Sequence, residues 1–407
     1  MLTINHSKQL NKEVSIAISG SKSESNRLLL LQKLYGNIQL KNISDAHDVQ
    51  VMQKALKSKS EIIDIHHAGT AMRFLTAYFA FANNKNLVLT GSERMQNRPI
   101  QILVEALQKL GAEINYTKKE GFPPLQISGK SNQEDVIELH ANISSQYISA
   151  LLLIAPKLKN GLQIKLQGKI TSLPYLKMTL QLLEKIGVEF TFENNLIVVK
   201  PKQQIQNLQY TIESDWSSAS YHFSIVALAE NIQLHLKHFK NNSLQGDAKL
   251  IEIYKHFGVE AKLDKGVLSL QKKPNFSLPQ HIEFNLIEQP DLAQTIAVTC
   301  LGLGINCSLT GLHTLKIKET DRLQALKNEL EKFGAEVKID DKSLLLKSVH
   351  PLPKNVQIKT YQDHRMAMAF APLATKTSLQ IEDPDVVEKS YPKFWEDLQS
   401  IGFSFTN

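Results

Sequence analysis

The sequence predicts an α/β protein of two similar domains, each built from three repeated units. Three observations support this fold class. The chain has 407 residues, 42% of them hydrophobic, which is long for one core and suits two domains of about 200 residues. A pattern of helix, glycine and strand recurs along the whole chain. Between its copies lie further helices that are apolar on nearly every side, so we expect them to be buried.

The repeated pattern is an amphipathic helix that ends at a glycine and is followed by a short strand. The first copy reads LLLLQKLYGNIQL and the last reads FWEDLQSIGFSF. The glycines are Gly36, Gly111, Gly187, Gly258, Gly334 and Gly402, separated by 75, 76, 71, 76 and 68 residues. Glycine suits the left-handed conformation that ends many helices. The nearly even spacing indicates a repeated unit that is too large for a solenoid.

Five segments are expected to form the buried helices of these units. They span residues 69–82, 144–156, 217–230, 291–303 and 363–374, and each begins with glycine, hydroxyl, amide or charged side chains. Such helix starts suit phosphate, because the free N–H groups and the positive end of the helix dipole attract anions. The alternative is ordinary N-capping by Ser, Thr and Asp, which is the simpler interpretation for any single helix.

Basic side chains stand beside several helix starts, which capping does not explain. In ISGSKSESNRLLLLQKL, Lys22 and Ser23 lead into a helix, and Arg27 lies on the same face as Ser23. In LKIKETDRLQALKNEL, Lys318 and Arg322 crowd a helix start. A cation there opposes the helix dipole, so we expect a bound anion to relieve the opposition.

Two later segments add charge near the end of the chain. TYQDHRMAMAFAPLA opens with His364 and Arg365 and is otherwise apolar, so Met366 and Met368 are expected in the core. EKSYPKFWEDL places Lys389 before a turn that contains proline.

Composition argues against several classes of protein. No apolar run approaches the roughly 18 residues needed to cross a bilayer. The start, MLTINHSKQLNK, resembles neither a signal nor a transit peptide, so a cytoplasmic protein without membrane contact is expected. The net charge of +7 is carried by scattered Lys and Arg, which disfavours nucleic acid and suits small anions. Cys300 and Cys307 share one apolar stretch and are expected to be core residues rather than a disulfide or zinc site.

The segments together resemble the successive motifs of one enzyme family, the 5-enolpyruvylshikimate-3-phosphate (EPSP) synthases. The chain carries, in family order, SGSKSESNRLLLLQKL, HAGTAMRFL, LTGSERMQNRPI, SSQYISALL, SDWSSASY, KETDRLQALKNELEKFGAEV, DHRMAMAFA and KSYPKFW. KETDR and DHRMAMAFA are the most specific of these. The resemblance implies two domains, each of three βαβαββ units as in enolpyruvyl transferases, with the active site in the cleft between them. It also implies that the chain crosses twice, so that residues 1–20 and 215–407 form one domain and residues 21–214 the other.

The same resemblance implies a reaction. The family transfers the enolpyruvyl group of phosphoenolpyruvate to the 5-hydroxyl of shikimate 3-phosphate, in aromatic amino acid biosynthesis, through a tetrahedral intermediate that loses phosphate. No metal or organic cofactor is expected. The implied partners are these two small molecules, the implied state is a monomer, and the family is the target of glyphosate.

Residue roles also follow from the resemblance. Phosphoenolpyruvate is expected to contact Lys22, Gly69, Arg98, Gln146, Arg322, Arg365 and Lys389. Arg322 and Arg365 would bind its carboxylate, and Lys22, Arg98 and Lys389 its phosphate. Shikimate 3-phosphate is expected to contact Lys22, Ser23, Arg27, Ser144, Ser145, Gln146, Ser172, Tyr175, Asp291 and Lys318. Asp291 and Glu319 are the candidate acid–base groups, with Lys22 assisting at the departing phosphate.

Three positions depart from the family pattern. His67 and Thr314 replace a usual Asn, and Phe74 replaces a usual Pro. These changes concern the fine geometry of the donor pocket, whereas Gly69 matches the glyphosate-sensitive pattern.

Two other functions remain as alternatives. One is the sister enzyme that uses UDP-N-acetylglucosamine and normally has a cysteine on a mobile loop; the other is a non-catalytic protein that binds small anions.

Overall fold

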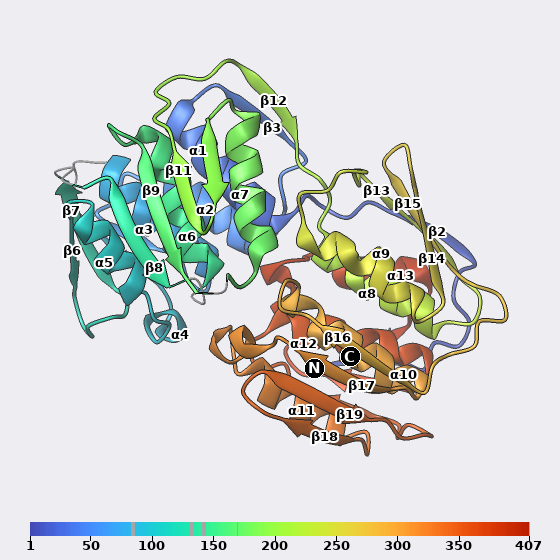
Figure 1. Cartoon of the computed structure of the whole chain (residues 1–407). Helices are drawn as coiled ribbons and strands as arrows, with labels where there is room; N and C mark the ends of the chain where they lie inside the picture. Colours follow the sequence, from blue (N-terminus) through green and yellow to red (C-terminus); the bar gives the residue numbers. More distant parts are fainter. Residues whose placement is uncertain (83–85, 131–133, 141–143, 169, 407) are drawn as a thin grey trace. The chain divides into compact units, whose positions relative to one another are not determined.

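The computed structural model describes residues 1–82, 86–130, 134–140, 144–168 and 170–406. The chain divides into two compact units (Figure 1). Unit 1 comprises Met1–Ser19 and Glu213–Asn407, and unit 2 comprises Gly20–Ile212. Among the helices of these described ranges, none has the length and apolar character that crossing a bilayer requires.

Unit 2 contains three sheets and a set of helices packed on them. Its strands are β3 (Ile38–Lys41), β4 (Ile62–Asp64), β5 (Leu87–Thr90), β6 (Ala112–Tyr116), β7 (Leu125–Lys130), β8 (Val136–His140), β9 (Leu162–Gln167), β10 (Phe190–Glu193), β11 (Leu196–Val199) and β12 (Leu208–Thr211). Its helices are α1 (Lys22–Tyr35), α2 (His47–Lys57), α3 (Gly69–Ala82), α4 (Glu93–Gln96), α5 (Gln101–Lys109), α6 (Ser145–Ile154), η1 (Ala155–Lys157) and α7 (Leu173–Lys185). Helices α1, α2, α6 and α7 pack around one another and α3.

Unit 1 also contains three sheets with helices packed on them, and each of its sheets has four strands. Its strands are β1 (Leu2–Ile4), β2 (Glu13–Ile16), β13 (Gln233–Lys237), β14 (Val259–Asp264), β15 (Val267–Lys272), β16 (His281–Asn285), β17 (Asn306–Thr310), β18 (Glu336–Ile339), β19 (Ser343–Lys347), β20 (Val356–Ile358), β21 (Leu379–Ile381) and β22 (Phe405–Thr406). Its α-helices are α8 (Trp216–Leu228), α9 (Leu250–Lys255), α10 (Ala293–Leu303), α11 (Arg322–Glu331), α12 (His364–Phe370) and α13 (Phe394–Ile401). Short 3₁₀ turns are η2 (Gly246–Lys249), η3 (Pro290–Leu292), η4 (His313–Ile317), η5 (Ala371–Thr375) and η6 (Pro384–Lys389).

Five of the six sheets in the described residues share one pattern. In the order β4-β5-β7-β6, the first pair is parallel and the next two pairs are antiparallel. The same sequence of pairings occurs in β8-β9-β11-β10, β2-β13-β15-β14, β16-β17-β19-β18 and β20-β21-β1-β22. The sixth sheet is the parallel pair of β3 and β12. The α/β fold class is therefore confirmed, with three sheets in each unit.

Two strands are exchanged where the chain changes units. β2 precedes α1 in the sequence but pairs with β13 in unit 1. β12 precedes α8 but pairs with β3 in unit 2. β2 therefore completes a sheet of unit 1 just before the chain passes to unit 2, and β12 completes a sheet of unit 2 just before the chain returns to unit 1.

The predicted helix ends and buried helices are present, but three of the five predicted helix segments divide into an α-helix and a short 3₁₀ turn. All six repeat glycines have positive φ, between 74° at Gly258 and 110° at Gly402, as a left-handed C-cap requires. Residues 69–82 form α3 as predicted. The segment 144–156 divides into α6 and η1, 291–303 divides into η3 and α10, and 363–374 divides into α12 and η5. Asp291 therefore lies in the turn before α10 and does not begin the helix itself.

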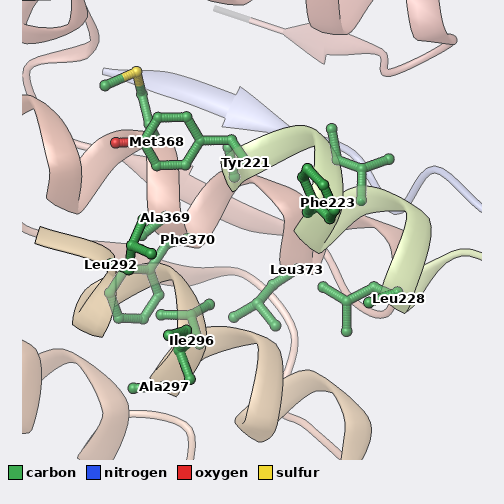
Figure 2. Close-up of a cluster of buried hydrophobic side chains, with 14 of the residues drawn as sticks. Tyr221, Phe223, Leu228, Leu292, Ile296, Ala297, Met368, Ala369, Phe370 and Leu373 are labelled. Atoms are coloured by element: carbon green, nitrogen blue, oxygen red, sulfur yellow. The ribbon is translucent and has the colours of Figure 1, made fainter. Parts of the chain in front are cut away.

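The core of unit 1 forms where these apolar helices meet. Figure 2 shows Tyr221 of α8, Ile296 of α10, and Met368 and Phe370 of α12 in one cluster with Leu373 of η5. Met366, Cys300 and Cys307 are also buried, so their assignment to the core is confirmed. The side chains of α10 and α12 are almost all buried, and the charged residues Asp291, just before α10, and Arg365, in the first turn of α12, lie at the edge of this core.

Candidate active site

Arg322, the first residue of α11, is surrounded by carboxylates from three elements. Its side chain is only 2% exposed. Its Nε donates to Asp363 Oδ2 at 2.5 Å, its Nη1 to Asp291 Oδ1 at 2.8 Å, and its Nη2 to Glu319 Oε2 at 2.7 Å. Burial alone would lower the pKa of Arg322, but the charges of Asp363, Glu319 and Asp291 outweigh it and raise the pKa. The anion that we expected to relieve this cation is thus supplied by the protein's own carboxylates.

Asp291 is the carboxylate that joins the cations of this cluster. Its Oδ1 lies 3.6 Å from Lys318 Nζ, and its Oδ2 accepts from Arg365 Nη2 at 3.1 Å. Burial alone would raise the pKa of Asp291, but the positive charges of Arg365, Lys318 and Arg322 outweigh it and hold the pKa well below its usual range. Asp291 is therefore ionised at neutral pH and can accept a hydrogen bond or a proton.

Glu319 connects this cluster to the end of η6. Its Oε2 accepts from Arg322, and its Oε1 lies 3.4 Å from Lys389 Nζ. The Lys389 and Glu319 side chains are only 12% and 15% exposed, so the pair is partly desolvated and stronger than a surface ion pair. The structure thus brings together all six predicted residues of unit 1: Asp291, Lys318, Glu319, Arg322, Arg365 and Lys389.

In unit 2, Lys22 begins α1 and pairs with a buried carboxylate. Ser21 caps the helix by accepting from the Glu24 N–H. Lys22 Nζ lies 3.3 Å from Asp48 Oδ2, and the Asp48 side chain is 5% exposed. Asp48 lies in the first turn of α2. The ion pair therefore joins the starts of two helices and holds the Lys22 amine against unit 2.

Arg27, one turn further along α1, is buried and held by four hydrogen bonds. Its Nε donates to Thr179 Oγ1 at 2.8 Å and its Nη2 to Ser149 Oγ at 3.1 Å. The remaining bonds run to the carbonyl oxygens of Ser23 at 2.8 Å and Tyr175 at 3.3 Å. Burial lowers the pKa of Arg27 to about 10, against the opposite effect of Tyr175 and Glu24, so it is charged at neutral pH.

Phe74, one of the three residues that depart from the family pattern, lies against Arg27. The centre of its ring is 5.4 Å from Arg27 Cζ, within the range of a cation–π contact. Phe74 itself is fully buried. A buried aromatic ring in place of proline therefore adds a contact to the guanidinium that we expect to bind shikimate 3-phosphate.

The remaining residues of unit 2 that are predicted to bind the donor form a second small group. A Cβ on Gly69 would lie 2.5 Å from Arg98 Nη1, so a side chain there would displace the guanidinium from its present position. Arg98 Nε is buried and lacks a hydrogen-bond partner among the described residues. Gln146 Nε2 donates to Thr70 Oγ1, next to Gly69, at 3.1 Å.

The predicted hydroxyls lie at the starts of α6 and α7. Ser144 caps α6 by accepting from the Gln146 N–H at 3.4 Å, and Ser145 is the first residue of the helix. Ser172 precedes α7 in a left-handed conformation, with φ of 53°. Its carbonyl accepts from the Tyr175 N–H at 3.1 Å, and Tyr175 in turn touches Arg27. Tyr175, Ser172 and Arg27 are thus brought together.

Sequence reasoning missed several partners of these residues. Asp48 lies 26 residues from Lys22, and Asp363 lies 41 residues from Arg322. Asp363 was noted only as a helix start, and Thr179 not at all. No local pattern identifies such partners. Among the described residues, no group of three or more His, Cys, Asp or Glu is arranged to hold a metal ion.

Solved structures with the same fold are enolpyruvyl transferases. An EPSP synthase from Acinetobacter baumannii matches with a TM-score of 0.79 at 19% identity, covering 100% of both chains. The enolpyruvyl transferase NikO from Streptomyces tendae matches with a TM-score of 0.77 at 13% identity, covering 100% of this chain and 98% of that one. These likenesses define the fold class of the protein.

Sequence relatives define the family more narrowly. The EPSP synthase (3-phosphoshikimate 1-carboxyvinyltransferase) family model matches residues 53–398. The chain is 45% identical to a 3-phosphoshikimate 1-carboxyvinyltransferase of Bacteroides fragilis and 33% identical to one of Mannheimia haemolytica, over 96% of each chain. This chain belongs to the EPSP synthase family. The resemblance stated from its motifs is confirmed, and UDP-N-acetylglucosamine is not favoured as the acceptor.

Proposed function

We propose that this protein is an enzyme that transfers the enolpyruvyl group of phosphoenolpyruvate to the 5-hydroxyl of shikimate 3-phosphate and releases phosphate. The observation that carries the proposal is the ionised carboxylate of Asp291, held among Arg365, Lys318 and Arg322. A carboxylate next to three cations suits a reaction in which a hydroxyl is activated beside an anionic partner.

The donor is assigned to cations of both units. Arg365 is the principal ligand for its carboxylate, because the Nε and both Nη atoms of Arg322 already donate to Asp363, Asp291 and Glu319. Lys22, Arg98 and Lys389 bind its phosphate. Gly69 and Gln146 shape the place where the donor lies, since any side chain at Gly69 would meet Arg98.

Binding of the donor phosphate changes the partner of Lys389. In the unliganded protein this amine is paired with Glu319 Oε1. A phosphate carries more negative charge than a carboxylate, so Lys389 turns toward the phosphate when the donor binds. Glu319 then keeps only Arg322 among these two cations, and its Oε1 becomes available to exchange a proton.

The acceptor is assigned to hydroxyls and to Arg27. Ser23 and Arg27 bind its carboxylate, and Tyr175 lies beside its ring. Ser144, Ser145, Gln146 and Ser172 bind its phosphate, with Lys22 near both substrates. Asp291 and Lys318 bind its hydroxyls. Helix starts at α6 and α7 suit the phosphate because their N–H groups attract anions.

The chemistry is an addition followed by an elimination. The oxygen of the 5-hydroxyl bonds to C2 of phosphoenolpyruvate and passes its proton to Asp291, while C3 gains a proton from Glu319. In the second step C3 returns its added proton to Glu319, the C2–C3 double bond reforms, and the bond from C2 to the phosphate oxygen breaks while Asp291 passes the proton of the 5-hydroxyl to the departing phosphate. Lys22 stabilises the charge on the departing phosphate.

A phosphate-release assay tests the reaction and its alternatives together. Purified protein is given phosphoenolpyruvate with shikimate 3-phosphate, with UDP-N-acetylglucosamine, or with neither. Phosphate is expected only with shikimate 3-phosphate. Release only with the UDP-sugar would assign the sister activity, and release with neither would favour a binding protein.

A monomeric state and a cytoplasmic location stay predictions, to be checked by light scattering and cell fractionation.

A further inference from the structure

A partly buried serine, Ser217, and a buried aspartate, Asp247, contact each other beside Arg365 and have no part in the roles assigned above. Ser217, the second residue of α8, has its Oγ 2.5 Å from Asp247 Oδ2 and 3.4 Å from Arg365 Nη2. Asp247 lies in η2 and is 5% exposed. A hydroxyl has one proton to donate, and the guanidinium can only donate. Ser217 therefore gives its proton to Asp247 and offers a lone pair to Arg365.

We propose that Ser217, held by Asp247, is a positioning residue for Arg365 and so sets how tightly the protein binds the carboxylate of its donor. The inference rests on the proposed function, because it takes Arg365 as the ligand of that carboxylate. Arg365 Nη2 also donates to Asp291 Oδ2 at 3.1 Å. The nitrogen is thus held between η3 and α8, and the direction of the guanidinium is fixed before the ligand arrives, which lowers the cost of binding.

The surroundings of Asp247 favour this role over a purely structural one. Arg365 is the cation that acts on Asp247, and Asp291 and Asp215 oppose its ionised form. The two helices packed on η2 are α8, which presents Ser217, and α9, whose Glu252 and Lys255 pair with each other at the surface. A buried carboxylate is costly unless it is paired, and the route to its cation passes through the Ser217 hydroxyl.

Removing the hydroxyl tests the positioning role. Ser217→Ala is expected to raise KM for phosphoenolpyruvate about tenfold, the usual effect of losing a hydrogen bond to a charged group. The change in kcat should stay within about twofold, because the lost contact acts in the ground and transition states alike. KM for shikimate 3-phosphate should not change. Ser217→Thr, which keeps a hydroxyl, should restore the wild-type KM.

The matched control is Ser218→Ala, one residue further along α8. Ser218 is buried, and its hydroxyl is absent from the described bonds to Arg365. Its KM for the donor should equal that of the wild type. An equal rise in KM in Ser218→Ala, or an unchanged KM in Ser217→Ala with only a lower Tm, would make Ser217 a structural residue and overturn the proposal.

A double-mutant cycle tests whether Asp247 acts through Ser217. Asp247→Asn is expected to change donor affinity by about threefold or more when Ser217 is present and by less than about 1.5-fold in Ser217→Ala. Equal effects in both backgrounds would mean that Asp247 acts through space, against the proposal. Calorimetric titration with phosphoenolpyruvate alone keeps the two questions separate. A wild type that releases no phosphate contradicts the proposed function, whereas an unchanged Kd in Ser217→Ala contradicts the positioning role.

Discussion

Two carboxylates in unit 1 have different electrostatic surroundings, which suggests different parts in proton transfer. Asp291 is ionised, because Arg365, Lys318 and Arg322 outweigh its burial. An ionised carboxylate has no proton to donate, so we assign to Asp291 the acceptance of a proton and not the donation of one. Glu319 pairs with Arg322 and Lys389, and Lys389 is the cation that we assign to the donor phosphate. We therefore assign proton acceptance to Asp291 and proton donation to Glu319, according to the cation that each carboxylate shares with a substrate.

We predict that Asp291→Asn folds normally, binds shikimate 3-phosphate and loses about 10²–10⁴ in kcat. A merely structural role at the helix start is disfavoured, because the N-cap of α10 is Leu292 and the helix has no side-chain cap. Steady-state kinetics and calorimetry measure the two quantities. Asp321→Asn is the control, since Asp321 caps α11 through the Gln324 N–H and should keep near wild-type kcat. Near wild-type turnover in Asp291→Asn would reduce Asp291 to a positioning group.

Glu319→Gln is expected to show a similar loss of kcat for a different reason. Glutamine keeps the size and one acceptor oxygen of Glu319 but cannot take up or release a proton at neutral pH. Arg322 keeps its bonds to Asp291 and Asp363, so the fold should be preserved. Circular dichroism checks the fold and a phosphate-release assay gives kcat. A variant with intact kcat would exclude Glu319 as the proton donor to C3.

The charged residues could be predicted from the sequence, but their pairing could not. Lys318, Glu319 and Arg322 stand within five positions, and this density itself signals a site. Asp363 and Asp48 reach their cations only through the fold, across 41 and 26 residues. For Arg322 these distant partners replace the bound anion that we expected, since the protein's own carboxylates neutralise its charge before any ligand binds.

At the scale of elements, five helix starts carry a side-chain cap, three of them (α6, α8 and α12) at the predicted buried helices, whereas α10 has no side-chain cap. Ser21, Ser144, Asp215, Asp321 and Asp363 each accept a hydrogen bond from an N–H in the first turn of the helix that follows. Capping by one side chain leaves other N–H groups of the turn for a ligand. Capping and anion binding are therefore compatible at these helices, and the sequence alone could not separate them.

The turn before α12 is held in a strained conformation by a buried glutamate. Tyr361 and Gln362 have φ of 55° and 57°, a region that non-glycine residues seldom adopt. Glu329 of α11 is fully buried and accepts from Tyr361 Oη at 2.7 Å and from the Lys359 N–H at 3.0 Å. The turn leads directly into Asp363 and Arg365, so Glu329 supports the position of both.

We predict that Glu329→Gln lowers kcat/KM about tenfold, because a small displacement of Arg365 weakens its grip on the donor. It should also lower the free energy of unfolding by about 1–3 kcal/mol, as expected when a buried charged acceptor is lost. Kinetics and urea unfolding measure these effects. Glu331→Gln, two positions away on the exposed face and paired with Lys327, should change neither. Loss of stability with unchanged kcat/KM would limit Glu329 to a structural role.

At the scale of the whole molecule, the repeat was the most predictable feature. The glycine spacing indicated six α/β units, and five sheets with one common pattern, together with the pair of β3 and β12, correspond to them. The pairing of β2 with β13 and of β12 with β3 was not predictable, because each strand is short and its partner is chosen by the fold and not by local sequence. Long-range strand pairing and buried ion pairs are the parts that only the structure supplies.

Two buried groups of unit 1 make opposite contributions to stability in acid. Burial lowers the pKa of His222 from 6.5 to about 3, and it raises the pKa of Asp247 from 3.8 to about 6 despite Ser217 and Arg365. Between pH 4 and 6, His222 binds a proton in the unfolded chain but not in the folded one. Its contribution therefore lowers the free energy of unfolding as the pH falls. The folded chain binds one more proton at Asp247, so stability there is gained as the pH falls. The two contributions nearly cancel in the wild type.

Removing one of these two groups should reveal the pH dependence of stability that the other contributes. In Asp247→Asn the uncompensated His222 makes the free energy of unfolding fall by up to about 1.4 kcal/mol per pH unit, relative to the wild type, as the pH drops from 6 to 4. In His222→Gln the sign reverses, and stability rises relative to the wild type over the same range. The double variant should follow the wild-type slope, because Asp291 and the other carboxylates titrate alike in all four proteins. Urea unfolding at pH 4, 5, 6 and 7 measures the slopes. A wild-type slope in Asp247→Asn would show that Asp247 does not keep a proton in the folded state in this range.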